Sequence, residues 1–207
     1  MNGKLGCRHN SRQARQDAML LTARDIFLKK GFAATSMSEI SQMVGGSKGT
    51  LWSYFPTKER LFVAVVGEAS YEFSCCLESA ICEGQELRQT LHEFATVFLI
   101  ESTTPYAVRL MRVIASELER IPSLNSVLQA GMSRVLQKLT GFLKKEMASG
   151  RLRLADPNVA AHQFCALLRQ PANLLIWFGD EQSNQAIDRC RDDAVDMFLR
   201  AYATDRP

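Results

Sequence analysis

A short segment in the first third of the chain gathers side chains that are suited to binding nucleic acid. It combines a cation, hydroxyls, a glycine and two aromatic rings: Ser47, Lys48, Gly49, Thr50, Trp52, Ser53 and Tyr54. A lysine near the start of a helix can donate to guanine O6 and N7, and hydroxyls suit phosphate oxygens. A glycine lets the backbone approach DNA closely, and an indole can pack on a thymine methyl group or a sugar. The chemistry indicated is recognition of double-stranded DNA.

Two short helices joined by a glycine turn are predicted to position these side chains. Ser36 is suited to cap the first helix, and Gly45 and Gly46 are suited to end it, because glycine adopts positive φ at little cost. Ser47 is suited to cap the second helix, expected over residues 48–54. A short helix held against another by a tight turn has the geometry that enters a major groove.

Phosphate contacts are expected on either side of this segment. Thr35 or Ser36, together with the backbone N–H groups at the start of the first helix, would form one phosphate site. Lys58 would form another, at the start of a helix that Pro56 and Thr57 introduce.

A different interpretation of the same pattern is an ordinary helical hairpin, which is common in all-α proteins. Trp52 and Tyr54 would then belong to the core, since aromatic side chains are usually buried. Leu51 and Phe55 are better core candidates, because they lie four residues apart on the opposite face of the short helix.

Two longer phrases in the same region carry a family resemblance. SKGTLWSYFPTKERL resembles the phrase SKGTLYxxFxxKexL of the TetR family of bacterial transcriptional regulators, and IFLKKGFAATSMSEIS resembles its LFxxxGFxxTSvxxIA. The match covers residues 14–66 and departs from the pattern at Ser41, usually alanine, and at Gly46, usually a branched apolar residue. A glycine at position 46 should loosen the packing of the reading helix.

The resemblance implies a division of the chain into two domains. Residues 12–72 would form the DNA-binding domain, with the helix-turn-helix at about 36–55, and residues 73–207 would bind a ligand and form a homodimer. RIPSLNSVL and GRLRLADPNVAA are similar to phrases of the family in that second part. Two reading helices about 34 Å apart would then bind a palindromic operator.

Helical periodicity continues to the end of the chain, with no strand-like alternation, so an all-α protein of about nine helices is expected. The first helix should run from about Arg12 to Lys30 behind a flexible basic arm, and the last from about Ser183 to Tyr202. Pro171 should kink or split a helix near Arg169, because proline removes a backbone donor.

Charge is unevenly distributed along the chain. Residues 1–60 carry a net charge of +6 and residues 61–207 carry −3, which fits a DNA-binding head on a nearly neutral body. Neither a membrane span nor a secretory signal is evident, and the six cysteines lack metal-ligand spacing, so a cytoplasmic protein with reduced thiols is expected. No catalytic motif, metal site or cofactor is predicted.

The second domain offers residues for a ligand pocket and for a dimer interface. The predicted pocket residues are large apolar side chains and one histidine: Phe73, Phe94, Phe98, Met111, Met132, Phe142, His162 and Trp177. The predicted interface residues lie in the last helices: Phe164, Leu168, Leu175, Phe198 and Leu199. Any single one of the pocket residues could equally be plain core.

Three cysteines, Cys75, Cys76 and Cys82, cluster near the expected end of one helix. They could sense oxidants or soft metals, but most buried free cysteines act as inert small hydrophobes.

The function predicted from the sequence is a homodimeric transcriptional repressor that a small apolar or amphipathic effector releases from its operator. The alternative is a helical enzyme or a carrier of lipids or small molecules that has no DNA-binding role. That alternative predicts that substitutions in the segment 48–54 would leave DNA affinity unchanged.

Overall fold

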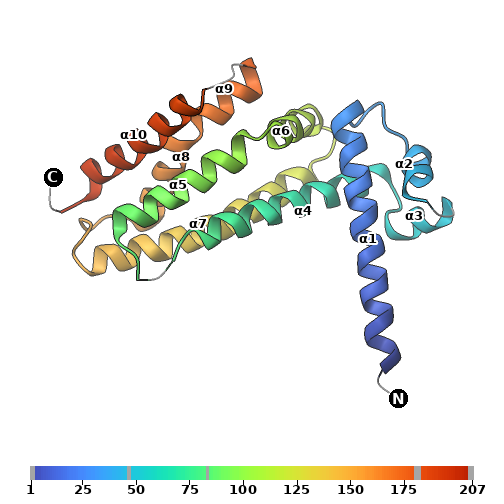
Figure 1. Cartoon of the computed structure of the whole chain (residues 1–207), viewed down its shortest axis with the longest axis horizontal. Coiled ribbons are helices and arrows are strands. Elements are labelled where there is room, and N and C mark those ends of the chain that lie inside the picture. Colours follow the sequence, from blue (N-terminus) through green and yellow to red (C-terminus); the bar gives the residue numbers. More distant parts are fainter. Residues whose placement is uncertain (1–2, 46–47, 83, 180–182, 205–207) are drawn as a thin grey trace. The chain divides into compact units, whose positions relative to one another are not determined.

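The computed structural model describes residues 3–45, 48–82, 84–179 and 183–204, and these form ten α-helices (Figure 1). Their bounds are α1 Gly3–Lys30, α2 Met37–Val44, α3 Lys48–Tyr54, α4 Lys58–Ser79, α5 Leu87–Thr103, α6 Pro105–Glu117, α7 Ser123–Ala148, α8 Pro157–Leu168, α9 Gln170–Phe178 and α10 Asn184–Tyr202. The one β-type pairing in the described residues is an isolated bridge between Leu152 and Ala203. The predicted all-α class is confirmed.

The helices divide between two compact units. The first unit comprises residues 1–69 and 113–127, and the second comprises residues 70–112 and 128–207. Because the boundaries fall inside helices, α4, α6 and α7 each contribute residues to both units. Segment 113–127 therefore packs with the N-terminal helices, although it lies within the range predicted for the C-terminal domain.

The first unit is built around three aromatic side chains. Phe27 of α1, Phe32 of the following turn and Phe62 of α4 lie with ring centroids 5.0–5.8 Å apart, and all three are buried. Edge-to-face and offset contacts of this kind stabilise a core beyond the burial of their area. This cluster joins α1 to α4 and supports the turn that leads into α2.

Helix α1 starts earlier than predicted. The expected start was Arg12, behind a flexible arm, but the helix begins at Gly3. Its N-terminal turns extend beyond α2 and α3, which lie beside its C-terminal half (Figure 1). Once a helix is nucleated by packing, each further residue adds a hydrogen bond at small cost, so a polar segment can continue it. Gly31, with a φ of 80°, ends the helix as predicted.

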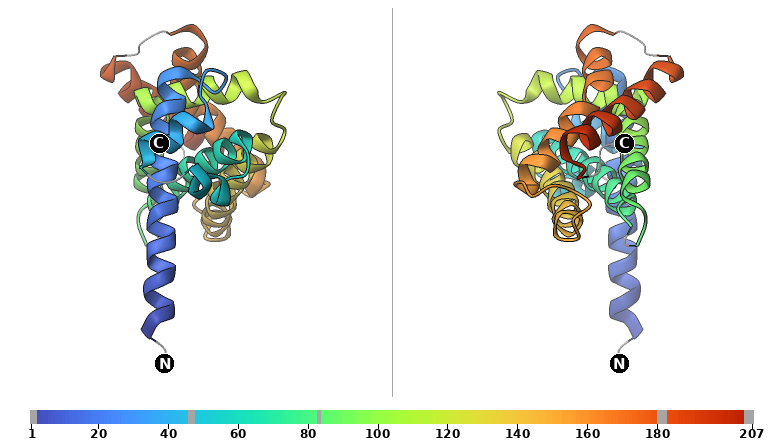
Figure 2. Two further views of the ribbon diagram at one scale, coloured as in Figure 1. Left: turned by 90° about the vertical axis from the view of Figure 1, so that its right-hand side faces the viewer. Right: turned by 90° about the vertical axis from the view of Figure 1, so that its left-hand side faces the viewer.

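The second unit packs its C-terminal helices around α5. Figures 1 and 2 show α10 lying along α5 and α8, and α8 and α9 also contact α5. A chain of aromatic contacts runs through this core: Phe94 to Phe164 at 5.9 Å, Phe164 to Phe198 at 5.0 Å, and Phe198 to Tyr202 at 4.7 Å. The four rings come from α5, α8 and α10, so they join the three helices.

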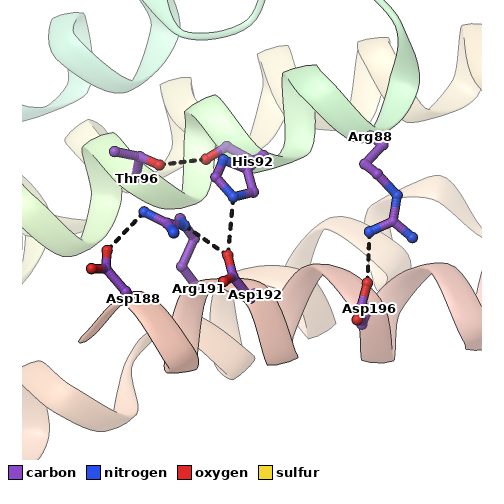
Figure 3. Close-up of polar contacts among 7 residues, drawn as sticks. All are labelled: Arg88, His92, Thr96, Asp188, Arg191, Asp192 and Asp196. Atoms are coloured by element: carbon purple, nitrogen blue, oxygen red, sulfur yellow. Dashed lines mark hydrogen bonds and ion pairs between the residues drawn. The ribbon is translucent and has the colours of Figure 1, made fainter. Parts of the chain in front are cut away.

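Exposed ionic contacts reinforce the pairing of α5 with α10 (Figure 3). Arg88 donates to Asp196 at 2.6 Å, and His92 lies 3.0 Å from Asp192. Arg191 also donates to Asp192, which holds the pKa of that carboxyl below its ordinary value. Because these pairs are open to solvent, they fix the register of the two helices more than they stabilise the fold.

The predicted bounds of the last helix are confirmed, since α10 runs from Asn184 to Tyr202. Asp156 caps α8, with its carboxylate accepting from the Asn158 N–H at 2.8 Å, and Ser183 caps α10. The predicted break near Arg169 separates α8 from α9, and Pro171 lies in the first turn of α9. Among the described residues, no helix is both long and apolar enough to cross a membrane.

The aromatic chain of the second unit generates a prediction about stability. Phe164→Ala should lower the free energy of unfolding by about 3–5 kcal/mol, because it removes a fully buried ring between Phe94 and Phe198. Urea unfolding followed by circular dichroism measures the change. Leu154→Ala, at a position 84% exposed, is the matched control and should change stability by less than about 0.5 kcal/mol. Equal effects of the two substitutions would contradict this packing.

Candidate nucleic-acid interface

Helix α2 is held at both ends by short-range contacts. The Glu39 N–H donates to the Ser36 hydroxyl at 3.2 Å, which confirms the predicted cap, and Gly45 ends the helix with a φ of 73°. Ile40 is fully buried. Lys30 of α1 pairs with Glu39, so the end of α1 and the start of α2 are joined by a side-chain contact as well as by the turn.

Helix α3 has one face in the core and one face outside it. Leu51, within the helix, is 1% exposed, and Phe55, the residue directly after the helix, is 6% exposed. Both are buried, as predicted for the inner face. Gly49 and Ser53 are exposed, and the remaining candidate residues are half-buried: Thr50, Trp52 and Tyr54. The side chains suited to DNA therefore reach the surface of the first unit rather than its core.

Two features of the predicted interface lie outside the described residues. These are the turn residues Gly46 and Ser47 and the side chain of Lys48. The looser packing predicted from Gly46 and the helix cap predicted at Ser47 therefore also lie outside them. The backbone of Lys48 is described, and it opens α3. Its assignment as a base-reading residue therefore stays a prediction from the sequence.

A stacking contact connects α3 with α1. The Arg12 guanidinium lies over the Tyr54 ring, 5.4 Å from its centroid. Arg12 and the neighbouring Arg15 are both exposed. The contact brings the positive charge of α1 to the side where α3 presents its hydroxyls, and positive charge of this kind attracts the phosphates of DNA.

The two predicted phosphate-binding hydroxyls differ in their surroundings. Thr35 is 3% exposed, and its hydroxyl donates to the Gly31 carbonyl at 2.7 Å, where it helps to end α1. Ser36 is exposed, and its oxygen acts as the acceptor from Glu39. The hydrogen of that hydroxyl therefore suits a phosphate oxygen, and Ser36 is the better placed of the two.

Lys58 has a structural role that its sequence context does not predict. Its ammonium donates to the carbonyls of Phe32 and Thr35, both at 2.8 Å, and lies 4.3 Å from the centroid of the Phe32 ring. The side chain thus joins the start of α4 to the turn between α1 and α2. Its predicted phosphate contact stays a prediction. No local sequence pattern points to partners more than 20 residues away.

The start of α4 is electrostatically favourable in itself. The Arg60 N–H donates to the Thr57 hydroxyl at 3.2 Å, which confirms the predicted cap. A backbone hydrogen bond, with help from the Thr57 hydroxyl, holds the pKa of Glu59 below its ordinary value. A carboxylate at this end is stabilised by the positive pole of the helix.

The first unit therefore has the arrangement of a helix-turn-helix protein, with α2 and α3 joined by a short turn and supported by α1 and α4. Residues 20–65, all within this unit, match the profile of bacterial regulatory proteins of the tetR family, and residues 89–204 match that of the C-terminal domain of AefR-like transcriptional repressors. The chain belongs to the TetR family of bacterial transcriptional regulators. It is a DNA-binding regulator by family.

Individual relatives agree with this assignment. The chain is 29% identical to the regulator RutR of Escherichia coli K12 over 155 residues, which is 73% of this chain and 71% of RutR. The solved structure of the flavonoid-responsive regulator FrrA is 30% identical, with a TM-score of 0.77 and coverage of 94% of this chain and all of that one. A TetR-family regulator from Mesorhizobium loti is 26% identical, with a TM-score of 0.85 and coverage of 93% and 98%.

The predicted pocket residues are not gathered in one place. Phe94 and Phe98 are buried in the core, with Phe73 packed against them. Met111, His162 and Trp177 are exposed at the surface of the second unit, and their assignment to a ligand pocket stays a prediction. Met132 and Phe142 are half-buried.

Phe142 lines a groove of about 1220 Å³ at one end of the second unit. Its wall combines apolar, polar and charged side chains, among them Ile81, Leu87, Lys138 and Glu146. The groove is open to solvent, and its volume is sufficient for a small molecule.

The predicted dimer-interface residues lie mostly inside the second unit, and their assignment to an interface stays a prediction. Four of them are already buried by their own chain: Phe164, Leu168, Phe198 and Leu199. Leu175 is half-buried. Periodicity showed which helix faces are apolar but not whether α5 covers them. The large apolar side chains that these helices leave exposed are different ones: Val159, Trp177, Phe178 and Met197.

The cysteines divide between an open and an enclosed environment. Cys82 is exposed and donates to the Ser79 carbonyl, and Cys75 and Cys76 are half-buried. Cys165 is buried among apolar side chains, and that burial raises its pKa to about 11. No group of potential ligands in the described part of the chain could hold a metal ion.

Lys58→Met should loosen the first unit, because the substitution removes the donor for the carbonyls of Phe32 and Thr35. The expected loss is about 1–3 kcal/mol of unfolding free energy. Urea unfolding followed by Trp52 fluorescence in a Trp177→Phe background measures it. A loss below about 0.5 kcal/mol, together with a weaker salt dependence of DNA binding, would show that Lys58 serves phosphate and not the turn.

Alkylation should distinguish the cysteines at pH 8. Iodoacetamide reacts with the thiolate, so exposed Cys82 should be modified at least about tenfold faster than Cys165, whose pKa is raised to about 11. Peptide mass spectrometry of the folded protein follows both rates, and the urea-unfolded protein is the control in which the rates converge. Rapid modification of Cys165 in the folded protein would contradict its enclosed position.

Proposed function

We propose that the protein is a homodimeric repressor that binds a palindromic operator through α3 and is released by a small-molecule effector. The observation that carries the proposal is the two-sided character of α3. Leu51 and Phe55 are in the core, while Gly49, Thr50 and Tyr54 reach the surface. A seven-residue helix with such an outer face is suited to a major groove.

Roles in the complex follow from chemistry and position. Lys48 reads guanine at the first turn of α3, and Gly49 allows close approach of the backbone. Thr50 and Tyr54 bind phosphate oxygens, and Trp52 packs on a thymine methyl group or a sugar. Ser47 and the sites at Thr35, Ser36 and Lys58 complete the predicted contacts.

Dimerisation is supported by exposed apolar surface on the C-terminal helices. Val159 of α8, Trp177 and Phe178 of α9 and Met197 of α10 are 46–78% exposed. Large apolar side chains that a chain leaves exposed are candidates for an interface. A second copy of the chain fits this surface, because an operator with two equal halves requires two equal reading helices.

Control by an effector is supported by the second unit. The groove lined by Phe142 has the volume for a small molecule, and the relative FrrA is described as flavonoid-responsive. A small apolar or amphipathic effector would shift the protein away from the DNA-binding state only by binding the other state more tightly. The profile match to AefR-like repressors favours repression over activation. A regulator of this kind would act in the cytoplasm.

DNA binding by the full-length protein tests the proposal. A genomic footprint of the purified protein supplies the operator, and fluorescence anisotropy then measures affinity at several salt concentrations. Lys48→Ala and Tyr54→Ala should each weaken binding by about 1–3 kcal/mol, because each removes a base or phosphate contact. Lys144→Ala, at an exposed lysine of α7, is the matched control and should bind like the wild type.

Two results would decide against the proposal. One is an absence of salt-dependent DNA binding, which would favour the alternative of a helical carrier or enzyme. The other is a stoichiometry of one chain per operator, which would exclude the homodimer.

A further inference from the structure

Arg112 of α6 makes a paired contact with the C-terminal end of α9. Its Nε donates to the Ile176 carbonyl at 2.9 Å, and its Nη2 donates to the Leu175 carbonyl at 2.5 Å. The end of a helix has carbonyls without intrahelical partners and a partial negative charge. A guanidinium is suited to this position, because its planar fork offers two parallel donors.

Arg112 complements the backbone cap of α9. Gly179, with a φ of 68°, ends the helix, and its N–H donates to the carbonyls of Leu174 and Leu175. The Ile176 carbonyl is not among these acceptors, and it receives the Nε–H of Arg112 instead. The guanidinium therefore adds a donor for a carbonyl that the backbone cap does not use.

Helix α9 contacts α5 and α8, but few of its residues are buried. It is nine residues long, and Arg169, at its N-cap, makes no side-chain capping bond. Its buried residues are Pro171 and Ala172, both in its first turn. Isolated helices of this length are marginal in water, so the contacts at its C-terminal end weigh heavily in its stability.

The residues that Arg112 fixes are directly followed by exposed aromatic side chains. Trp177 and Phe178 come immediately after Leu175 and Ile176, and they are 63% and 78% exposed. Their direction depends on the last turn of α9, because they are part of it. The arrangement of this aromatic pair is therefore tied to the position of Arg112.

Arg112 also occupies a particular place in α6. The helix runs from Pro105 to Glu117, and Arg112 is its last residue within the second unit, since residues 113–117 belong to the first. A rotation or shift of α6 would carry the guanidinium away from the α9 carbonyls. α6 and α9 lie near each other in Figure 1.

We propose that Arg112 is a positioning residue that couples α6 to the aromatic pair Trp177–Phe178, and so sets the surface presented to the second copy of the chain. The coupling to dimerisation rests on the homodimer of the proposed function. The capping of α9 by Arg112 does not, and it can be tested separately.

Hydrogen–deuterium exchange of the full-length protein tests the cap. Arg112→Ala should raise the exchange rate of the amides of residues 174–179 at least about tenfold, because the last turn of α9 loses two donors. Arg109→Ala is the matched control, since Arg109 is an exposed arginine of the same helix. Unchanged exchange in α5 and α10 verifies that the variant is folded. Wild-type rates at residues 174–179 in Arg112→Ala would overturn the cap.

Sedimentation velocity across a concentration series tests the coupling. Arg112→Ala should raise the dimer dissociation constant about tenfold or more, whereas Arg109→Ala should leave it unchanged. Faster exchange in α9 with an unaltered dissociation constant would overturn the coupling. If the wild type is a monomer at every concentration, the proposed homodimer fails and the coupling with it, while the exchange result still decides the cap.

Discussion

The structure of the first unit depends on the support of a helix that is too short to be stable alone. α3 has seven residues, and an isolated helix of that length does not persist in water. Burial of Leu51 and Phe55 holds it against the unit, and the aromatic cluster of Phe27, Phe32 and Phe62 forms the core of that unit. Because the inner face is fixed, the outer face can be devoted to polar and aromatic groups that contribute little to folding.

The turn before α2 shows how the unit keeps this geometry. The Thr35 hydroxyl and the Lys58 ammonium both donate hydrogen bonds to backbone carbonyls of the segment 31–35. Carbonyls in such a turn lack helical partners, so side-chain donors stabilise it. Two residues that look like DNA contacts in the sequence therefore contribute to the scaffold that supports the contacts. In a DNA-binding protein, residues that support the fold and residues that contact DNA lie close together, because the supporting structure extends up to the interface.

In the second unit, too, most apolar side chains of the C-terminal helices serve the core. α5 is covered by α8, α9 and α10, and the aromatic chain from Phe94 to Tyr202 joins three of these helices. Phe164, Leu168, Phe198 and Leu199 are buried in this core, so within the single chain they are not exposed to a partner. What remains for a partner is the outer aromatic and aliphatic surface at Trp177, Phe178 and Met197.

Local features were predictable from the sequence, and long-range ones were not. The cap at Ser36, the start of the last helix at Ser183 and the break before Pro171 depend on neighbouring residues, so their patterns were sufficient. The contacts of Lys58 with Phe32 and of Arg112 with Ile176 join residues 26 and 64 positions apart, and no pattern announces them.

The same distinction applies to the predicted sites. Phe164 and Phe198 were assigned to the dimer interface because periodicity identifies an apolar face without showing what covers it. The residues of α3 were easier to place. Their inner and outer faces follow from helical spacing within a single short segment, and Leu51 and Phe55 are buried as that spacing predicts.

The central claim is that α3 is the element that contacts DNA. Hydrogen–deuterium exchange of the protein with and without its operator duplex tests this most directly. The account predicts slower exchange in residues 35–58 when the operator is bound, and no such change with a duplex of unrelated sequence at the same salt concentration. Protection confined to other helices, with residues 48–54 exchanging as in the free protein, would contradict it.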